Sequence, residues 1–145
     1  MKVSTILKNK GPEVITVGGH KTLFDAMQLL VNNKIGALLV IDMEATLIGI
    51  ISERDIIRAV FSNPETYITL PIKDFMATKV IVVEPDDELE YVESIITKNR
   101  IRHLPVVSNK RLVGLISIGD VVKTMLTDIK FENKYLMDYI HGNVF

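Results

Sequence analysis

The sequence predicts an α/β fold made of two copies of one strand–helix–strand–strand–helix unit. The first observation is a repeat, because "LIGIISERDI" returns later in the chain as "LVGLISIGDV". The interval from Ser52 to Ser117 equals the interval from Asp55 to Asp120. The second observation is composition, since 48% of the 145 residues are apolar and 24% are charged. That balance supplies a buried core for two small units and argues against disorder.

Each copy is expected to open with a short strand. The segments "EVITV" (13–17) and "KVIVVE" (79–84) are rich in β-branched residues and bounded by Pro or Gly, which is typical of strands. The resemblance of "VSTIL" (3–7) to "IKDFM" (72–76) extends the repeat to the start of each copy.

A helix is expected after each of these strands. In "TLFDAMQLLVNN" (22–33) the apolar residues recur at helical spacing. Capping boxes are predicted at the two helix starts, Thr22 with Asp25 in the first copy and Asp87 with Glu90 in the second.

The remaining part of each copy predicts a hairpin and a second helix. "ALLVID" and "LIGIIS" in the first copy match "LPVVS" and "LVGLIS" in the second. Such nearly continuous apolar runs indicate strands covered on both faces, and the short turns between them suit hairpins. Two such units would bury their apolar faces by packing sheet to sheet with pseudo-twofold symmetry.

These boundaries divide the chain into four parts. The first repeat covers 1–62, a surface linker covers 63–71, the second repeat covers 72–124, and a helical extension covers 125–145. A helix apolar on more than one side usually needs a partner. The extension is therefore expected as a long C-terminal helix that either folds back on its own domain or makes a dimer contact.

Composition and charge exclude several classes of function. The net charge of −1 gives no reason to expect nucleic acid or an acidic membrane as a partner. Cysteine is absent, which excludes disulfides and thiolate chemistry. No apolar run approaches the ~20 residues that span a bilayer, and the N-terminal segment lacks the apolar core of a signal peptide. A cytoplasmic protein is expected. The three histidines are far apart and belong to no catalytic or metal-binding pattern, so no enzyme is expected.

The repeated Ser-x-x-Asp has a structural and a functional interpretation. Structurally, Ser is an N-cap and Asp a first-turn acid that favours the helix dipole. Functionally, a helix start offers N–H groups and partial positive charge to a phosphate, and the serine hydroxyl can donate to it as well. The acid can then accept hydrogen bonds from two ribose hydroxyls. Gly119 would allow a ligand close to the backbone, and Arg54 is a candidate phosphate partner.

A second candidate feature is "IRHLPVV", which begins the second strand of the second repeat. Arg102 and His103 would lie beside the cleft between the packed sheets. Their counterparts Gly36 and Ala37 are small and uncharged, so the two clefts are expected to be unequal, one more basic than the other. The alternative is that Arg102 and His103 are simply solvated residues at a strand end.

These motifs resemble a tandem pair of cystathionine-β-synthase (CBS) domains. The resemblance rests on Gly, two apolar residues and Ser-x-x-Asp, preceded by "IRHLPVV" and repeated over residues ~1–124. It implies a compact pseudo-twofold module, often a dimer, that binds an adenine nucleotide such as AMP, ADP, ATP or NAD, or S-adenosylmethionine.

The resemblance also implies roles for individual residues. Aspartate would hold ribose hydroxyls, serine and the basic pair would contact phosphate, and the backbone of the strand starts would line adenine. Each slot would combine the Ser/Asp pair of one repeat with the strand start of the other. The candidate binding residues are Ser52, Arg54, Asp55, Ser117, Gly119, Asp120, Arg102, His103, Ile101, Ile35, Gly36 and Ala37.

The predicted function is that of a non-enzymatic adenine-nucleotide sensor. Binding would change the packing of the repeats or of a homodimer, and an unidentified regulated protein would respond. The alternative is a dimeric interaction scaffold that works without nucleotide.

Overall fold

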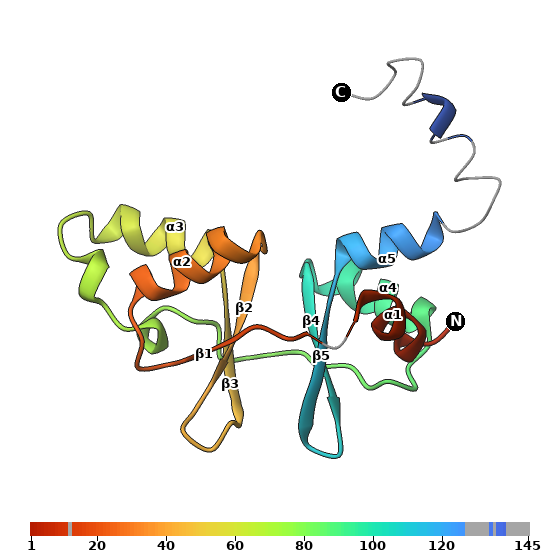
Figure 1. Ribbon diagram of the computed structural model, residues 1–145, viewed down its shortest axis with the longest axis horizontal. Helices are drawn as coiled ribbons and strands as arrows, with labels where there is room; N and C mark the ends of the chain where they lie inside the picture. The colour runs from red at the N-terminus through yellow and green to blue at the C-terminus, as the bar shows by residue number, and fades with distance from the viewer. Residues whose placement is uncertain (12, 127–133, 135, 139–145) are drawn as a thin grey trace.

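The computed structural model describes residues 1–11, 13–126, 134 and 136–138. Its elements form two α/β halves that lie side by side, with the strands of both halves at the centre (Figure 1). In chain order the elements are α1 (Val3–Lys10), β1 (Thr16–Gly18), α2 (Leu23–Asn33), β2 (Ala37–Ile41), β3 (Leu47–Ser52), α3 (Glu53–Ser62), the 3₁₀ turns η1 (Tyr67–Thr69) and η2 (Ile72–Asp74), α4 (Leu89–Asn99), β4 (His103–Ser108), β5 (Arg111–Ser117) and α5 (Ile118–Met125).

The two hairpins confirm the predicted repeat. In the first half β1 runs parallel to β2, and β2 pairs antiparallel with β3 in a three-stranded sheet. In the second half β4 pairs antiparallel with β5. Ala37 lies opposite Ser52 in the first hairpin, and His103 lies opposite Ser117 in the second. The same register therefore brings each strand start to the Ser of its own repeat.

The predicted strand at 79–84 is wrong in extent. Only Val83 pairs there, through a parallel bridge to Val106, with its N–H donating to the Pro105 carbonyl at 3.0 Å. Its neighbours Ile81 and Val82 are exposed. The β-branched run has the propensity for a strand, but only one residue reaches the edge of β4, so no ladder forms.

One of the two predicted capping boxes at the first helices is present. Thr22 accepts a hydrogen bond from the Asp25 N–H at 3.1 Å, and Asp25 accepts one from the Thr22 N–H at 3.0 Å. The box predicted from Asp87 and Glu90 is wrong, because the N-cap is Glu88 and its side chain caps nothing. The N–H of Leu89 donates instead to the carbonyl of Met1 at 2.8 Å.

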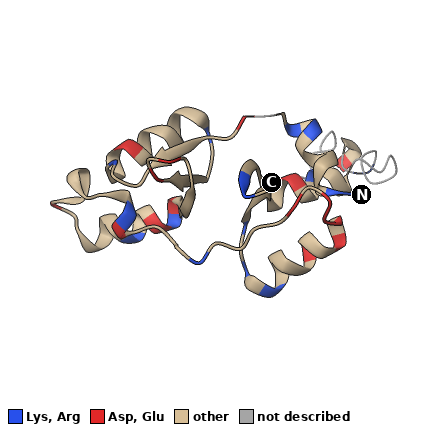
Figure 2. Ribbon diagram, turned by 90° about the horizontal axis from the view of Figure 1, so that it is seen from below, with Lys and Arg blue, Asp and Glu red and all other residues tan. Residues whose placement is uncertain are grey.

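The opening segments of the two repeats are exchanged. α1 packs on the second half, where Val3 and Ile6 join the buried core with residues of α4, β4 and β5. Ile72, the counterpart of Val3, is buried in the core of the first half. The chain crosses between the halves after α1 and again after η2 (Figure 2). Each core is thus completed by a segment that lies outside its own repeat in the sequence.

The stretch predicted as a surface linker takes part in the first core. Tyr67 and Leu70 pack against it, and the N–H of Leu23 donates to the Leu70 carbonyl at 2.9 Å. Strand β2 is buried on both faces, since Leu38 and Leu39 are both fully buried although successive side chains point to opposite sides. The prediction of strands covered on both faces is therefore confirmed for β2, but it is wrong for β5, where Val113 is 40% exposed.

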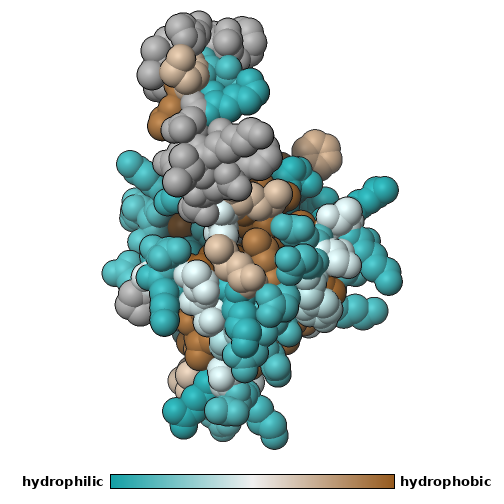
Figure 3. All heavy atoms as spheres, turned by 90° about the vertical axis from the view of Figure 1, so that its right-hand side faces the viewer, coloured by the Kyte–Doolittle hydropathy of each residue, from teal (hydrophilic) through white to brown (hydrophobic). Residues whose placement is uncertain are grey.

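Helix α5 ends at Met125, with Leu126 as its C-cap. Residues 134 and 136–138 are helical, and the rest of the predicted C-terminal helix lies outside the described residues. Figure 3 views the end of the molecule that carries α1, α4 and α5, and apolar atoms appear there among a hydrophilic majority. No helix in the described ranges is long and apolar enough to cross a bilayer.

Candidate functional site

Both Ser-x-x-Asp motifs lie where the last strand of a repeat passes into its last helix. Ser52 ends β3 and is the N-cap of α3, accepting from the Asp55 N–H at 3.3 Å. Asp55 in turn accepts from the Ser52 N–H at 2.9 Å. Ser117 and Asp120 form the same box at α5, with distances of 3.1 and 2.9 Å. The structural interpretation of the motif is therefore correct for both copies.

A second pair of backbone bonds fixes each strand start against its helix start. The N–H of Glu53 donates to the Gly36 carbonyl at 3.0 Å, and the N–H of Ile118 donates to the Arg102 carbonyl at 2.9 Å. Lys34 and Arg100, just before these strand starts, adopt left-handed backbone conformations with φ of 55° and 53°. The tight turns after α2 and α4 thus place the residues that follow them next to the starts of α3 and α5.

A hollow of about 340 Å³ lies at Asp55 and receives residues from both repeats. Its volume falls within the range of about 300–1,000 Å³ usual for ligand pockets. It contains seven of the twelve candidate residues, namely Gly36, Ser52, Arg54, Asp55, Ile101, Arg102 and His103. The Ser/Asp pair of the first repeat is thus brought together with the strand start of the second.

The hollow at Asp55 is basic. Four arginines line it, against the carboxylates of Glu53 and Asp55. Arg58 and Arg100 were missed by the sequence analysis, although signals for both exist. Arg58 follows Asp55 by one helical turn, and its Nη1 is 3.9 Å from Asp55 Oδ1. Arg100 directly precedes the "IRHLPVV" motif.

His103 lies between the two helix starts. A Cβ built on Gly36 would lie 3.7 Å from the His103 ring, so the two strand starts are close to each other. Burial lowers the pKa of His103, and the positive charge of Lys10 lowers it further, against the opposing effects of Glu53 and Asp120. The imidazole is therefore neutral near pH 7.

The hollow beside Asp120 is smaller, about 220 Å³, and has a different lining. Residues of α1 and α5 form it, and the strand start Ile35–Ala37 is not among its lining residues. Ile35 lies at a separate hollow, and Ala37 is buried in β2. Gly119 is exposed in the first turn of α5.

Asp120 already has a cationic partner. Lys10 Nζ lies 2.7 Å from Asp120 Oδ2. Burial raises the pKa of Asp120, but hydrogen bonds from Lys10 and Ser117 outweigh that effect, and the pKa lies below its usual value. Asp120 is thus a carboxylate held in a salt bridge.

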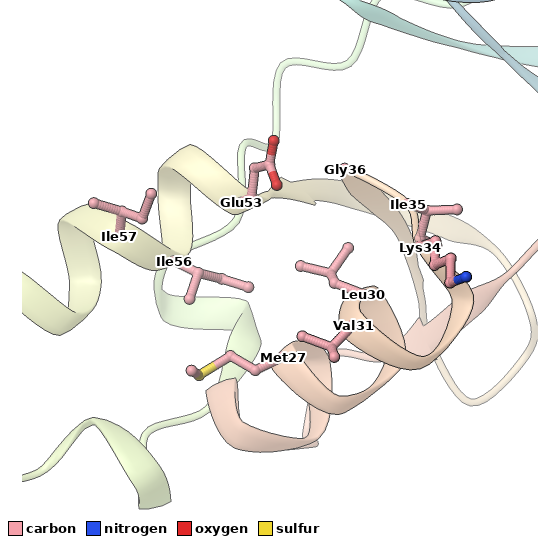
Figure 4. Close-up of a pocket in the computed structure, with 9 residues that line it drawn as sticks. All are labelled: Met27, Leu30, Val31, Lys34, Ile35, Gly36, Glu53, Ile56 and Ile57. Atoms are coloured by element: carbon pink, nitrogen blue, oxygen red, sulfur yellow. The ribbon is translucent and has the colours of Figure 1, made fainter.

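A larger hollow of about 530 Å³ lies between α2 and α3 (Figure 4). Met27, Leu30, Val31 and Ile56 make its lining mainly apolar, with Lys34 and Glu53 at its rim. It offers few polar groups to orient a ligand, so the smaller hollow at Asp55 is the better candidate site. Within the described ranges, no three His, Asp or Glu residues are grouped so as to hold a metal ion.

The fold and site define a duplicated α/β module in which the hollow at Asp55 is lined by residues of both repeats. The chain belongs to the CBS-domain family, since the family's sequence model matches residues 6–62 and 72–127. A curated relative is the mitochondrial CBS domain-containing protein CBSX3 of Arabidopsis thaliana, 31% identical over 97% of this chain and 72% of its own length.

Solved structures agree with this assignment. The CBS-domain protein ATU1752 from Agrobacterium tumefaciens superposes with a TM-score of 0.83 at 35% identity, covering 86% of this chain and 99% of that one. The CBS domain pair of protein MJ0100, crystallised with 5′-methylthioadenosine and S-adenosyl-L-methionine, gives a TM-score of 0.77 at 26% identity, covering 86% and 95%.

Proposed function

We propose that this CBS-domain pair binds an adenine nucleotide in the hollow at Asp55 and acts as a regulatory, non-enzymatic module. The observation that carries the proposal is the meeting of two repeats in one hollow. Asp55 and Ser52 come from the first repeat, and Arg102 and His103 come from the second. The structure of the MJ0100 pair with two adenosine derivatives supports an adenosine ligand.

The proposed roles follow from the chemistry of each group. Asp55 Oδ2 accepts hydrogen bonds from the N–H and hydroxyl of Ser52, whereas Oδ1 has Arg58 at 3.9 Å. Oδ1 is therefore the better acceptor for the ribose hydroxyls. Ile50, Ala77 and Ile101 provide apolar surface for adenine in the same hollow.

The charge of the hollow favours phosphate over sulfonium. Four arginines against two carboxylates leave the lining positively charged, and guanidinium groups pair well with phosphate oxygens. The sulfonium of S-adenosylmethionine would be repelled by the same groups. We therefore place AMP, ADP, ATP and NAD ahead of S-adenosylmethionine as ligands of this chain.

Regulation would arise because the ligand contacts both repeats. A ligand changes a conformational equilibrium only by binding one state more tightly than another. A nucleotide that joins Asp55 to Arg102 favours the arrangement in which these residues lie together. A homodimer or an unidentified protein partner would respond to that arrangement.

The test is a thermal-shift series with AMP, ADP, ATP, NAD, NADH, S-adenosylmethionine and 5′-methylthioadenosine. At 100 times the Kd a ligand stabilises the fold by about 2.7 kcal/mol, which corresponds to roughly 5–10 °C for a domain of this size. We expect a shift with the phosphate-bearing ligands that is clearly smaller in Asp55→Asn at the same ligand concentration. No shift with any ligand at millimolar concentration contradicts the proposal.

The second candidate is a dimeric interaction scaffold that works without nucleotide. Exposed apolar side chains on the helices favour it, with Val31, Ile57 and Phe61 exposed by 74, 65 and 86%. Sedimentation of the wild type and of Ile57→Glu separates the two candidates. A dimer that depends on Ile57, together with no thermal shift by any nucleotide, supports the scaffold.

A further inference from the structure

The salt bridge between Lys10 and Asp120 joins two segments that are far apart in the sequence. Lys10 ends α1, and its Nζ donates to Asp120 Oδ2 and to the Leu115 carbonyl, both at 2.7 Å. The side chains of Lys10 and Asp120 are exposed by 35 and 21%, so the bridge is partly shielded from water. Lys10 thus forms an ion pair with Asp120, the residue that is equivalent to Asp55 in the second repeat.

The first repeat has no equivalent lysine at its acid. In the matched opening segments, "VSTILKNK" (3–10) and "IKDFMATK" (72–79), Lys79 takes the position of Lys10. α1 is helical to Lys10, whereas the helical turn η2 ends at Asp74. The backbone at Lys79 is therefore not helical as it is at Lys10. Lys79 is exposed and does not line the hollow at Asp55.

Both the small volume of the hollow at Asp120 and the ion pair with Lys10 argue against ligand binding there. The hollow at Asp120 measures about 220 Å³, below the range of about 300–1,000 Å³ usual for ligand pockets. A ribose could reach the carboxylate only by separating it from an ammonium group at hydrogen-bond distance. Charge-assisted bonds of this kind are among the stronger hydrogen bonds of proteins.

We infer that Lys10 acts as an internal competitor that closes the Asp120 groove, so that each chain binds one nucleotide, at Asp55. This inference rests on the proposed function, since it concerns which of two related grooves the ligand enters. Lys10 is thereby the residue that determines the stoichiometry of binding. Removal of its charge opens a second site.

The experiment is isothermal titration of the full chain with ATP. We expect one ATP per chain for the wild type and two for Lys10→Met and Lys10→Gln. The matched control Lys79→Met keeps one. The double variant Lys10→Met/Asp120→Asn returns to one, which assigns the new site to Asp120. Circular dichroism and thermal melts verify that each variant is folded.

The outcomes separate the two proposals. Two ATP molecules per wild-type chain overturn the inference and leave the proposed function intact. A folded Lys10→Met protein that still binds one ATP, or that binds none because Lys10 holds phosphate, also overturns it. A wild type that binds none, with Lys10→Met binding one that Asp120→Asn abolishes, supports the role of Lys10 and contradicts the Asp55 site. No ATP binding by any variant overturns the inference, and the proposed function is overturned as well if the thermal-shift series also shows no response to AMP, ADP or NAD.

Discussion

Leu7 lies directly over Gly114, so that a Cβ built on Gly114 would come within 2.5 Å of Leu7 Cδ2. The same relationship joins Met76 to Gly49 in the other half, where the built Cβ would lie 2.5 Å from Met76 Sδ and 2.9 Å from the Ala77 carbonyl oxygen. Each opening segment thus packs against the last strand of the opposite half, at a position where no side chain fits.

Gly49→Ala is therefore expected to destabilise the protein, by about 1–3 kcal/mol as for other overpacked sites. Gly114→Ala is expected to cost less, because the end of a leucine side chain can move and a backbone carbonyl cannot. Gly119→Ala is the control, since its Cβ would meet only Ser117 Oγ, at 3.5 Å. Urea denaturation measures the stability of all three variants. Equal stability of Gly49→Ala and the wild type would contradict the close packing of the 72–77 segment on Gly49.

The two equivalent acids are expected to differ in binding. Asp55→Asn should weaken ATP binding about 10- to 100-fold, as expected for loss of hydrogen bonds to a charged group. Asp120→Asn should leave the affinity of the Asp55 site unchanged. Because each acid accepts a 2.9 Å bond from the N–H of its N-cap serine, both variants replace the carboxylate of the same cap contact by an amide oxygen. Titration calorimetry compares them, and equal losses would argue that the acids act only as caps.

Arg102→Ala is expected to reduce the affinity for ATP more than that for AMP. The longer phosphate chain has more negative charge to pair with the arginines of the hollow. Arg111→Ala is the control, because Arg111 lines a different hollow, between the tips of the two hairpins. The measurement is a titration of each variant with AMP, ADP and ATP, and an equal loss for all three ligands would place the phosphates elsewhere.

His103 is expected to make binding depend on pH. Because its pKa is lowered in the folded protein, a phosphate beside it raises that pKa, and binding takes up a proton. The affinity for ATP should therefore increase from pH 7.5 to pH 6 more steeply in the wild type than in His103→Gln. The variant also corrects for titration of the phosphate itself. If the affinity for ATP depends on pH equally in both proteins, His103 does not contact the phosphate.

The same lowered pKa predicts a change in stability without ligand. Below the unfolded-state pKa of about 6.5 the unfolded chain binds more protons than the folded one. The stabilising contribution of neutral His103 is therefore complete above that pH and is lost as the pH falls below it. Urea denaturation between pH 7.5 and 5.5 should show this loss in the wild type and not in His103→Gln, with His20→Gln as the control.

The sequence alone was sufficient to predict the parts of the fold that depend on local signals. The hairpins follow from continuous apolar runs, and the boxes at Thr22, Ser52 and Ser117 follow from a cap with an acid three residues later. The box predicted at Asp87 failed because the Asp87 carboxylate accepts from the Glu84 N–H at 2.7 Å, and the helix begins one residue later with a distant partner, the carbonyl of Met1, at its start. Local patterns do not reveal such partners.

The site could be predicted where its residues lie within or directly beside the repeated motifs. Arg102 and Asp55 were found because the two copies match around them. Lys10 was not found as a partner of Asp120, although the likeness of the opening segments was visible. Sequence similarity shows that two segments are equivalent, but it does not show which core each one completes.

The exchange of opening segments has a consequence for cutting the chain. A break just after α3 would leave α1 on one fragment and Ile72 on the other, although each belongs to the interior of the opposite half. Neither fragment could then close its own hydrophobic core, and each would supply what the other lacks. Co-expressed halves should reassemble in the manner of a split reporter, with recovery of the fold dependent on both pieces being present.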